Sequence, residues 1–316
     1  MNRFLGVSGV FLFLSCSIGL SESVTVTTSA DGFLFQENSK NILFYQRKPK
    51  SFDGAYTRNN YIHPLWNLDG TVLTEDAPAD HLHQRGIYWA WHQIKVGDIR
   101  CGDAWTCDRF AWDVTAAQIH PLANGAQKLD ITVLWQSPDF VDSEDKTLPI
   151  VQEKTTITVY RQQKDCRLID FDIRLLALQD KVAIGGSEDV KGYGGFSLRV
   201  KAPEDLIFQS AKGTVQPKTE AVQAGNWLDF NASFNPAAGK SGIAVFVHPD
   251  NPGATNKWII RQKRSMQNPV FPGRETVAIP RDRPMVLRYR LVMHKGDATR
   301  IQLDEMYQAY TQSKAP

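Results

Sequence analysis

The stretch TTITVYRQQKDCRLIDFDIRLL, residues 155–176, decides the fold class of this chain. Apolar and polar residues alternate through 155–161 and again through 168–176, and a period of two is typical of β-strands with one buried face. The polar residues 162–165 between them predict a turn. The stretch therefore predicts a β-hairpin.

The same alternation recurs along most of the chain, with Gly, Pro, Asn and Asp between the apolar runs. Many strands with few crossover helices favour a β-sandwich over an α/β fold. We therefore predict an all-β fold with two stacked antiparallel sheets. The other predicted strands are 23–28, 32–36, 42–46, 129–136, 196–201, 242–247, 257–262 and 285–293.

Only the C-terminus has helical spacing. Asp297 is a candidate N-cap, and Ile301, Met306, Tyr307 and Tyr310 follow at helical intervals. This pattern predicts one short helix over 299–311. No linker or internal repeat interrupts the strands, so we expect 22–316 to form a single β-sandwich domain.

The first residues are typical of a secretory signal peptide. Arg3 is followed by an apolar run over 4–20 with small residues near its end. A transmembrane anchor is the alternative, but the run is short and contains Ser and Gly. Cys16 suggests a lipoprotein site. Phe13, three residues earlier, fits such a site poorly. We therefore predict a signal peptide over 1–21 and a periplasmic or secreted protein.

Composition argues against a polyanionic partner. The chain has 36 Lys and Arg against 34 Asp and Glu, a net charge of +2. Without Arg3 this becomes +1, so we expect no nucleic acid as partner. No later segment is apolar enough to predict a membrane span. Cys101 and Cys107 could form a disulfide in an oxidising compartment, and unpaired thiols are the alternative.

The densest polar cluster runs from His63 to His92. If residues 81–85 are extended, His81, His83 and Arg85 project from one face. Two imidazoles and a guanidinium suit proton transfer or the binding of an anionic oxygen. His81 and His83 with Asp80 could instead hold a divalent metal, or could be ordinary surface residues.

Aromatic residues follow this cluster directly. Tyr88, Trp89 and Trp91 fit a β core, and aromatic rings also form platforms for sugars. Core packing is the simpler interpretation of each ring. Trp91 and the neighbouring His92 are nevertheless candidates for substrate contact.

Two later clusters also place polar groups at strand ends. Glu188, Lys191 and Arg199 flank a glycine-rich approach to a strand, where a backbone can come close to a ligand. His248 follows a strongly apolar strand, and loops at strand ends often carry binding residues. The alternatives are a charged turn and a structural turn. We predict that these clusters, including Arg261 and Asn268, converge with the first in one pocket.

Taken in order, these motifs resemble an exported bacterial family that carries the inherited label "methane oxygenase PmoA". This chain has glutamine at 84 where the family often has a second adjacent histidine. The resemblance implies a galactose mutarotase-like β-supersandwich and a role in processing glycans. The motifs are His63-Pro64, 80–86, Lys191 with Arg199, Trp227 with Asp229, 248–252, Trp258 with Arg261, Asn268-Pro269, and His294 with 296–297.

We therefore predict an exported carbohydrate-active enzyme, a hydrolase or lyase that cleaves or modifies a glycoside. The alternatives are a sugar epimerase, a non-catalytic glycan-binding protein and a structural envelope protein. An oligosaccharide or glycoside is the expected partner. The cofactor is left open, with a divalent metal as one option and no assigned metal ligand. The predicted catalytic residues are His81, His83, Arg85, Lys191 and His248, and the predicted substrate-binding residues are His63, Trp91, His92, Glu188, Arg199, Arg261 and Asn268.

Overall fold

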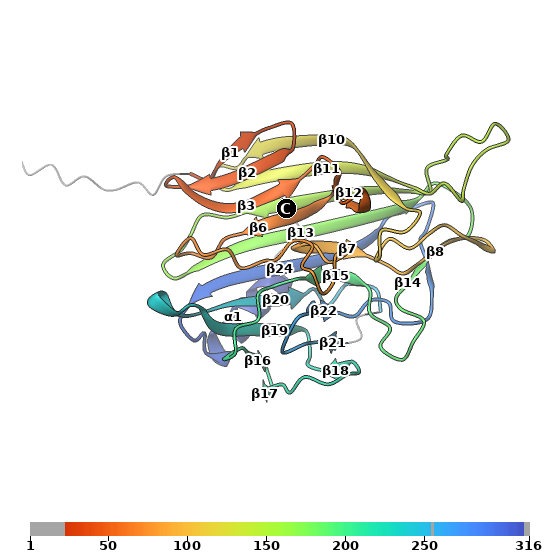
Figure 1. Cartoon of the computed structure of the whole chain (residues 1–316). Helices are drawn as coiled ribbons and strands as arrows, with labels where there is room; N and C mark the ends of the chain where they lie inside the picture. The colour runs from red at the N-terminus through yellow and green to blue at the C-terminus, as the bar shows by residue number, and fades with distance from the viewer. Residues whose placement is uncertain (1–22, 254–255, 313–316) are drawn as a thin grey trace, which may run out of the picture.

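Two large antiparallel sheets stack face to face and form the body of the protein (Figure 1). The computed structural model describes residues 23–253 and 256–312. The all-β prediction is confirmed, and so is the short C-terminal helix. The predicted signal peptide, 1–21, lies outside the described residues. None of the described helices is both long and apolar enough to cross a membrane.

The two large sheets contain most of the predicted strands. The six-stranded sheet has the order β1 (Thr25–Thr28), β2 (Gly32–Glu37), β3 (Lys40–Gln46), β6 (Tyr61–Leu65), β7 (Ile87–Ala90), β15 (Gly195–Leu198). The nine-stranded sheet has the order β10 (Ala111–Pro121), β11 (Gln127–Gln136), β12 (Val151–Val159), β13 (Cys166–Ala177), β24 (Met285–Lys295), β20 (Gly239–Val247), β19 (Trp227–Asn235), β16 (Ile207–Ser210), β17 (Gly213–Thr214).

Three small sheets extend the predicted two-sheet plan. One contains β23 (Val277–Ala278), β14 (Val182–Gly185), β8 (Gln93–Val96) and β9 (Ile99–Arg100). Another contains β18 (Val222–Gln223), β21 (Lys257–Ile259) and β22 (Asn268–Pro269), and the last is the hairpin of β4 (Lys50–Phe52) and β5 (Ala55–Arg58). A short 3-10 helix, η1 (Pro236–Ala238), joins β19 to β20.

Aromatic side chains join the two large sheets. Trp89 of β7 meets Phe171 of β13 edge-on, with ring centroids 6.2 Å apart. Phe196 of β15 stacks on Tyr289 of β24 at 4.4 Å. All four rings are buried, so the core lies between the inward faces of β7 and β15 and those of β13 and β24.

A carboxylate is buried inside this apolar core. Glu153 of β12 is fully buried, and its oxygens accept hydrogen bonds from four side chains. Trp89 Nε1 and Trp135 Nε1 donate from the two sheets at 2.8 and 2.9 Å, and Asn60 Nδ2 and Thr155 Oγ1 donate at 2.9 and 2.7 Å. These bonds offset much of the cost of burying the polar group.

The C-terminal helix α1 (Arg300–Gln312) covers the outer face of the nine-stranded sheet. Tyr307 and Tyr310 pack there against Phe246, whose neighbours in β20 point into the main core. Thr299 caps the helix, because its Oγ1 accepts from Gln302 N at 3.3 Å. The predicted cap at Asp297 is therefore wrong by two residues. The side chain of Ile301 lies outside the described residues.

The predicted hairpin at 162–165 is confirmed as the β12–β13 connection. Two long strands, β10 and β19, were not predicted. Residues 81–85 do not form the extended segment that was considered, because 81–84 form a turn. Cys101 and Cys107 are free thiols, so no disulfide joins them.

Candidate functional site

His81 and His83 lie on a tight turn before β7. His81 N donates to Pro78 O at 2.9 Å, and Gln84 N donates to His81 O at 3.0 Å. The turn still brings the two imidazoles together, with ring centroids 5.7 Å apart at 78°. An extended strand would also place Arg85 beside the two imidazoles, and the turn does not.

Arg199 fixes the shape of this turn. Its guanidinium is 1% exposed and donates to Glu75 Oε2 at 2.7 Å, to Gln84 Oε1 at 2.8 Å and to Asp80 at 2.9 and 3.0 Å. Every nitrogen of the side chain is therefore bound within the protein. The predicted role of Arg199 in substrate binding is wrong for this reason, and we assign it as a positioning residue.

Arg85 is buried in a similar way. It donates to Asp76 Oδ1 at 3.1 Å and to the carbonyl oxygens of Tyr56 and Lys50 at 2.9 and 3.3 Å. These contacts attach the β4–β5 hairpin to the body of the protein. Arg85 thus holds a neighbouring hairpin, and its predicted catalytic role is not supported.

The β4–β5 hairpin places aromatic rings beside His83. Within 23–253 and 256–312, the exposed aromatic side chains are Phe52, 45% exposed, and Tyr56, 37% exposed, and both lie on this hairpin. The Tyr56 and His83 ring centroids are 6.4 Å apart. Tyr56 also has a φ of 50°, a conformation that non-glycine residues rarely adopt and that recurs at functional sites.

His83 has the electrostatics of a neutral base. Burial lowers its pKa to about 4, and the charges of Arg58, His81 and His92 act in the same direction. The side chain is half-buried, and no described residue forms a hydrogen bond with its ring nitrogens. At neutral pH the imidazole is therefore uncharged and able to accept a proton.

His81 is oriented by a carboxylate. Its Nδ1 lies 3.1 Å from Asp80 Oδ2, and because a carboxylate only accepts, the proton of this bond lies on Nδ1. Burial alone would raise the pKa of Asp80, but hydrogen bonds from His81 and Arg199 outweigh it and lower the pKa. Asp80 therefore stays charged and fixes the orientation of the His81 ring.

A second imidazole–carboxylate pair lies nearby. His92 Nδ1 is 2.8 Å from Asp103 Oδ2, and the His92 ring stacks on Trp105 at 5.4 Å and meets Tyr193 edge-on at 5.0 Å. Burial would raise the pKa of Asp103, but the hydrogen bond from His92 is the main influence that lowers it. The charge of His92 also acts to lower the pKa of His83.

The loop around Lys191 contacts the His92 ring through Tyr193. Lys191 Nζ pairs with Asp189 Oδ2 at 3.0 Å and lies 5.5 Å from the Tyr193 ring centre. Glu188 is exposed and pairs with Arg100 at 2.9 Å, so it lies at the edge. Sequence reasoning missed Tyr193, although it lies within the glycine-rich cluster. It also missed Asp103, whose pairing with His92 has no local signal.

Three predicted substrate-binding residues form hydrogen bonds within the protein. Trp91 is fully buried and donates its Nε1 to Phe271 O at 3.0 Å. Asn268 is fully buried and donates to backbone oxygens beside β15. Arg261 binds the carbonyl oxygens of residues 218 and 219 at 2.6 and 2.7 Å. Trp91 and Asn268 expose no surface to a ligand, so their predictions are wrong.

The other two histidines among the predicted site residues, His63 and His248, lie in different parts of the fold. His63 Nδ1 lies 2.9 Å from Thr74 Oγ1, close to the Arg85 network, and burial lowers its pKa. His248 packs edge-on against Tyr310 of α1 at 5.2 Å, on the outer side of the nine-stranded sheet. The predicted convergence of all three clusters in one pocket is therefore wrong for His248.

The described residues contain no set of ligands for a metal ion. Within the described parts of the chain, no three His, Cys, Asp or Glu side chains are placed to hold a metal ion. The carboxylates nearest to the histidines already bind other groups, since Asp80 pairs with Arg199 and Asp103 accepts from the backbone N of Trp105 and Thr106. Their remaining contacts are with the histidines themselves.

Comparison with known proteins identifies a family but no activity. No curated protein matches the chain. The profile of a family of unknown function (DUF6807) matches residues 34–308, a span that includes every predicted site residue. The chain therefore belongs to the DUF6807 family.

Proposed function

We propose that this protein is an exported carbohydrate-active enzyme that cleaves or modifies a glycoside by acid/base chemistry at the His81–His83 turn. One observation carries the proposal. Two adjacent imidazoles have different environments, because His83 is neutral with a pKa of about 4 and His81 is held by a charged Asp80. Two imidazoles side by side with different hydrogen-bond partners suit the roles of a base and an acid.

The exposed aromatics support a sugar as the substrate. A pyranose ring has an apolar face that packs well on an aromatic side chain, and Tyr56 presents such a ring next to His83. Phe52 extends the same surface. The antiparallel sheets are compatible with the galactose mutarotase-like fold that the resemblance implies, and this likeness is part of the proposal.

The surrounding carboxylates favour a lyase over a hydrolase. Most glycosidases use two carboxylates that flank the bond. Here Glu75 and Asp80 both accept hydrogen bonds from the buried Arg199, and the shared cation makes each carboxylate a weaker nucleophile. A neutral imidazole can instead remove a proton from a carbon next to a carbonyl group.

The corresponding step is a β-elimination. His83 takes the proton, and the electron pair of the C–H bond forms a C=C double bond. The glycosidic C–O bond breaks, and its electrons go to the leaving oxygen, which receives a proton from protonated His81. Lys191, which pairs with Asp189, is the proposed cation for a substrate oxygen.

The experiment is an activity screen on the mature protein. A panel of neutral oligosaccharides, uronate-containing oligosaccharides and 3-keto glycosides is incubated with the wild type and with His83→Ala, each with and without chelator. We expect an unsaturated product from a carbonyl-bearing glycoside with the wild type only. Equal product from both proteins would overturn the proposal.

A non-catalytic glycan-binding protein is the second candidate. The exposed pair Phe52 and Tyr56 would be sufficient for binding without chemistry. Saturable binding of an oligosaccharide, unchanged in His83→Ala and without any product, would favour it.

A further inference from the structure

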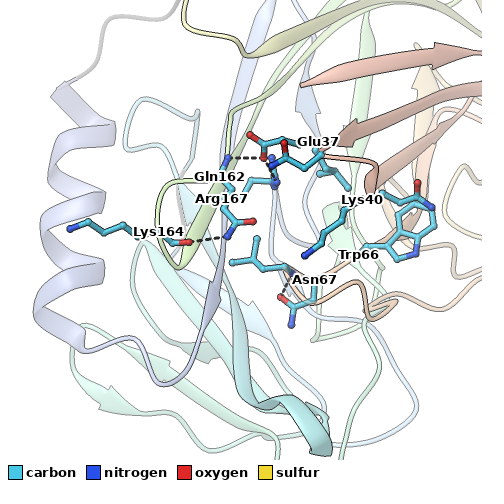
Figure 2. A pocket seen from close by; sticks show the side chains of 11 residues that line it. Glu37, Lys40, Trp66, Asn67, Gln162, Lys164 and Arg167 are labelled. Atoms are coloured by element: carbon cyan, nitrogen blue, oxygen red, sulfur yellow. Dashed lines mark hydrogen bonds and ion pairs between the residues drawn. The ribbon is translucent and has the colours of Figure 1, made fainter. Parts of the chain in front are cut away.

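A separate cavity lies at one end of the sandwich, where the β2–β3 turn, the segment after β6 and the β12–β13 turn meet (Figure 2). Its volume is about 270 Å³. None of the predicted site residues lines it. Small-molecule sites usually enclose about 300 to 1,000 Å³, so this cavity suits one compact unit.

A buried ion pair forms part of its wall. Arg167 Nη2 donates to Glu37 Oε2 at 2.6 Å, and Gln162 N donates to the same oxygen at 3.0 Å (Figure 2). The two charged side chains are 5% and 2% exposed, so they are fixed and neutralise each other. Oε1 of Glu37 forms no hydrogen bond with any described residue, and Arg161 Nε pairs with it only at 3.9 Å.

The other polar groups of the lining are mainly unused donors. Lys40 Nζ, Trp66 Nε1 and Asn41 Nδ2 form no hydrogen bond or ion pair with the described residues, although Asn41 Oδ1 accepts from Gln36. Figure 2 shows the Lys40 side chain reaching between Glu37 and Asn67. The ligand that satisfies such a wall carries acceptors and a negative charge.

Lys164, the second lysine of the lining, adds no further donor to the cavity. Lys164 also lines the cavity, but its side chain points away from the other labelled residues in Figure 2. Its carbonyl oxygen accepts from Gln162 Nε2 at 2.9 Å, so the backbone of Lys164, and not its ammonium group, lines the cavity. One positive charge, that of Lys40, therefore faces the cavity.

We propose that this cavity binds a single anionic sugar unit, a hexose ring that bears a carboxylate or a sulfate group. The Lys40 ammonium pairs with the anion, and the half-buried Trp66 contributes its ring and its N–H. Asn41 Nδ2 donates to a hydroxyl oxygen of the ring. This site is distinct from the His81–His83 turn, and the proposal does not depend on the proposed enzymatic activity.

The test measures binding of three probes by calorimetry and by NMR of the tryptophan indole N–H signals. The probes are D-glucuronate, glucose 6-sulfate and D-glucose. We expect saturable binding of one or both anions, weakened by salt, and much weaker binding of glucose. Equal binding of all three probes, or no saturable binding of any, would overturn the proposal.

The variants assign that binding to the cavity. Lys40→Met keeps the aliphatic stem and should weaken anion binding by about 10- to 100-fold, the range of a hydrogen bond to a charged group. Lys164→Met is the matched control and should bind as the wild type does. Lys40→Arg should restore part of the affinity, which excludes a folding defect. Unchanged affinity in Lys40→Met would place the binding elsewhere and contradict the proposal.

His83→Ala separates the two proposals. It should retain anion binding at the cavity even if it abolishes turnover. Loss of anion binding in His83→Ala would show that the sugar occupies the histidine site instead, which would also contradict the cavity proposal.

Discussion

Arg199 and Asp80 are 119 positions apart in the chain, and the guanidinium of one donates to both oxygens of the other at 2.9 and 3.0 Å. The same carboxylate contacts His81 Nδ1. Arg199, which follows β15, thus fixes the orientation of the His81 imidazole through Asp80. Mutation of Arg199 therefore acts on the site without any contact between Arg199 and a substrate.

Arg199→Met should lower the free energy of unfolding by about 1 to 3 kcal/mol, because it removes the charged hydrogen bonds that join Glu75, Gln84 and Asp80. Urea unfolding followed by fluorescence measures this change. Arg100→Met is the matched control, since Arg100 and Glu188 are an exposed pair that should contribute less than about 1 kcal/mol. Equal small effects would mean that Arg199 does not hold the turn.

His83→Ala should reduce turnover by about 10² to 10⁴, the usual contribution of a positioned proton-transfer group. Its melting temperature should stay close to that of the wild type, since a half-buried ring without hydrogen bonds stabilises little. His120→Ala, at an exposed pair with Asp130, should change neither quantity. Lower stability with normal turnover per folded molecule would instead indicate a structural role for His83.

His83 also predicts a direction of pH dependence. Its pKa is about 4 in the folded protein against about 6.5 when unfolded, so the unfolded chain binds more protons between these values. The stability contributed by His83 is therefore complete above pH 6.5 and declines as the pH falls toward 4. Titration of the imidazole by NMR measures the pKa, and a value near 6.5 would contradict this prediction.

His294 predicts the opposite direction. Burial alone would lower its pKa, but Asp229, whose Oδ1 lies 3.0 Å from His294 Nε2, raises it above 6.5. Its stabilising effect is complete below pH 6.5 and is lost as the pH rises through the folded value. Unfolding of the wild type and of His294→Asn between pH 6 and 9 tests this, because the difference between them should shrink with rising pH.

Glu153→Gln should destabilise the core by about 1 to 3 kcal/mol, the cost of leaving buried polar groups unsatisfied. An amide nitrogen at this position would face a donor, either the indole N–H of Trp89 or that of Trp135. Denaturant unfolding measures the loss. Gln152→Glu on the same strand, half-buried and outside this network, is the control and should change stability little.

Two strands, β13 and β19, show what made a strand easy or hard to predict from the sequence. The alternation of β13 is visible because one face packs in the core and the other stays partly open. β19 is buried on both sides, since Trp227 lies under α1 while Leu228 faces the main core. Its buried polar residue Asp229 further breaks the pattern.

The candidate site was predictable in composition and not in geometry. His81 and His83 were found because the residue types are unusual and close in sequence. The alternation of the two histidines with other residues is typical of a strand. Local backbone hydrogen bonds nevertheless form a turn there. The true roles of Arg85 and Arg199 depend on partners that lie far away in the sequence, which no local pattern encodes.

The dependence of the His81–His83 turn on Arg199 also sets an order of events during folding. A growing chain contains both histidines long before residue 199 exists, and contacts of such high sequence separation form slowly. The turn gains its fixed shape only when β15 pairs with β7 and Arg199 N donates to Gly86 O. Activity at the turn would therefore begin only after β15 has paired with β7. Activity would thus indicate that folding is complete.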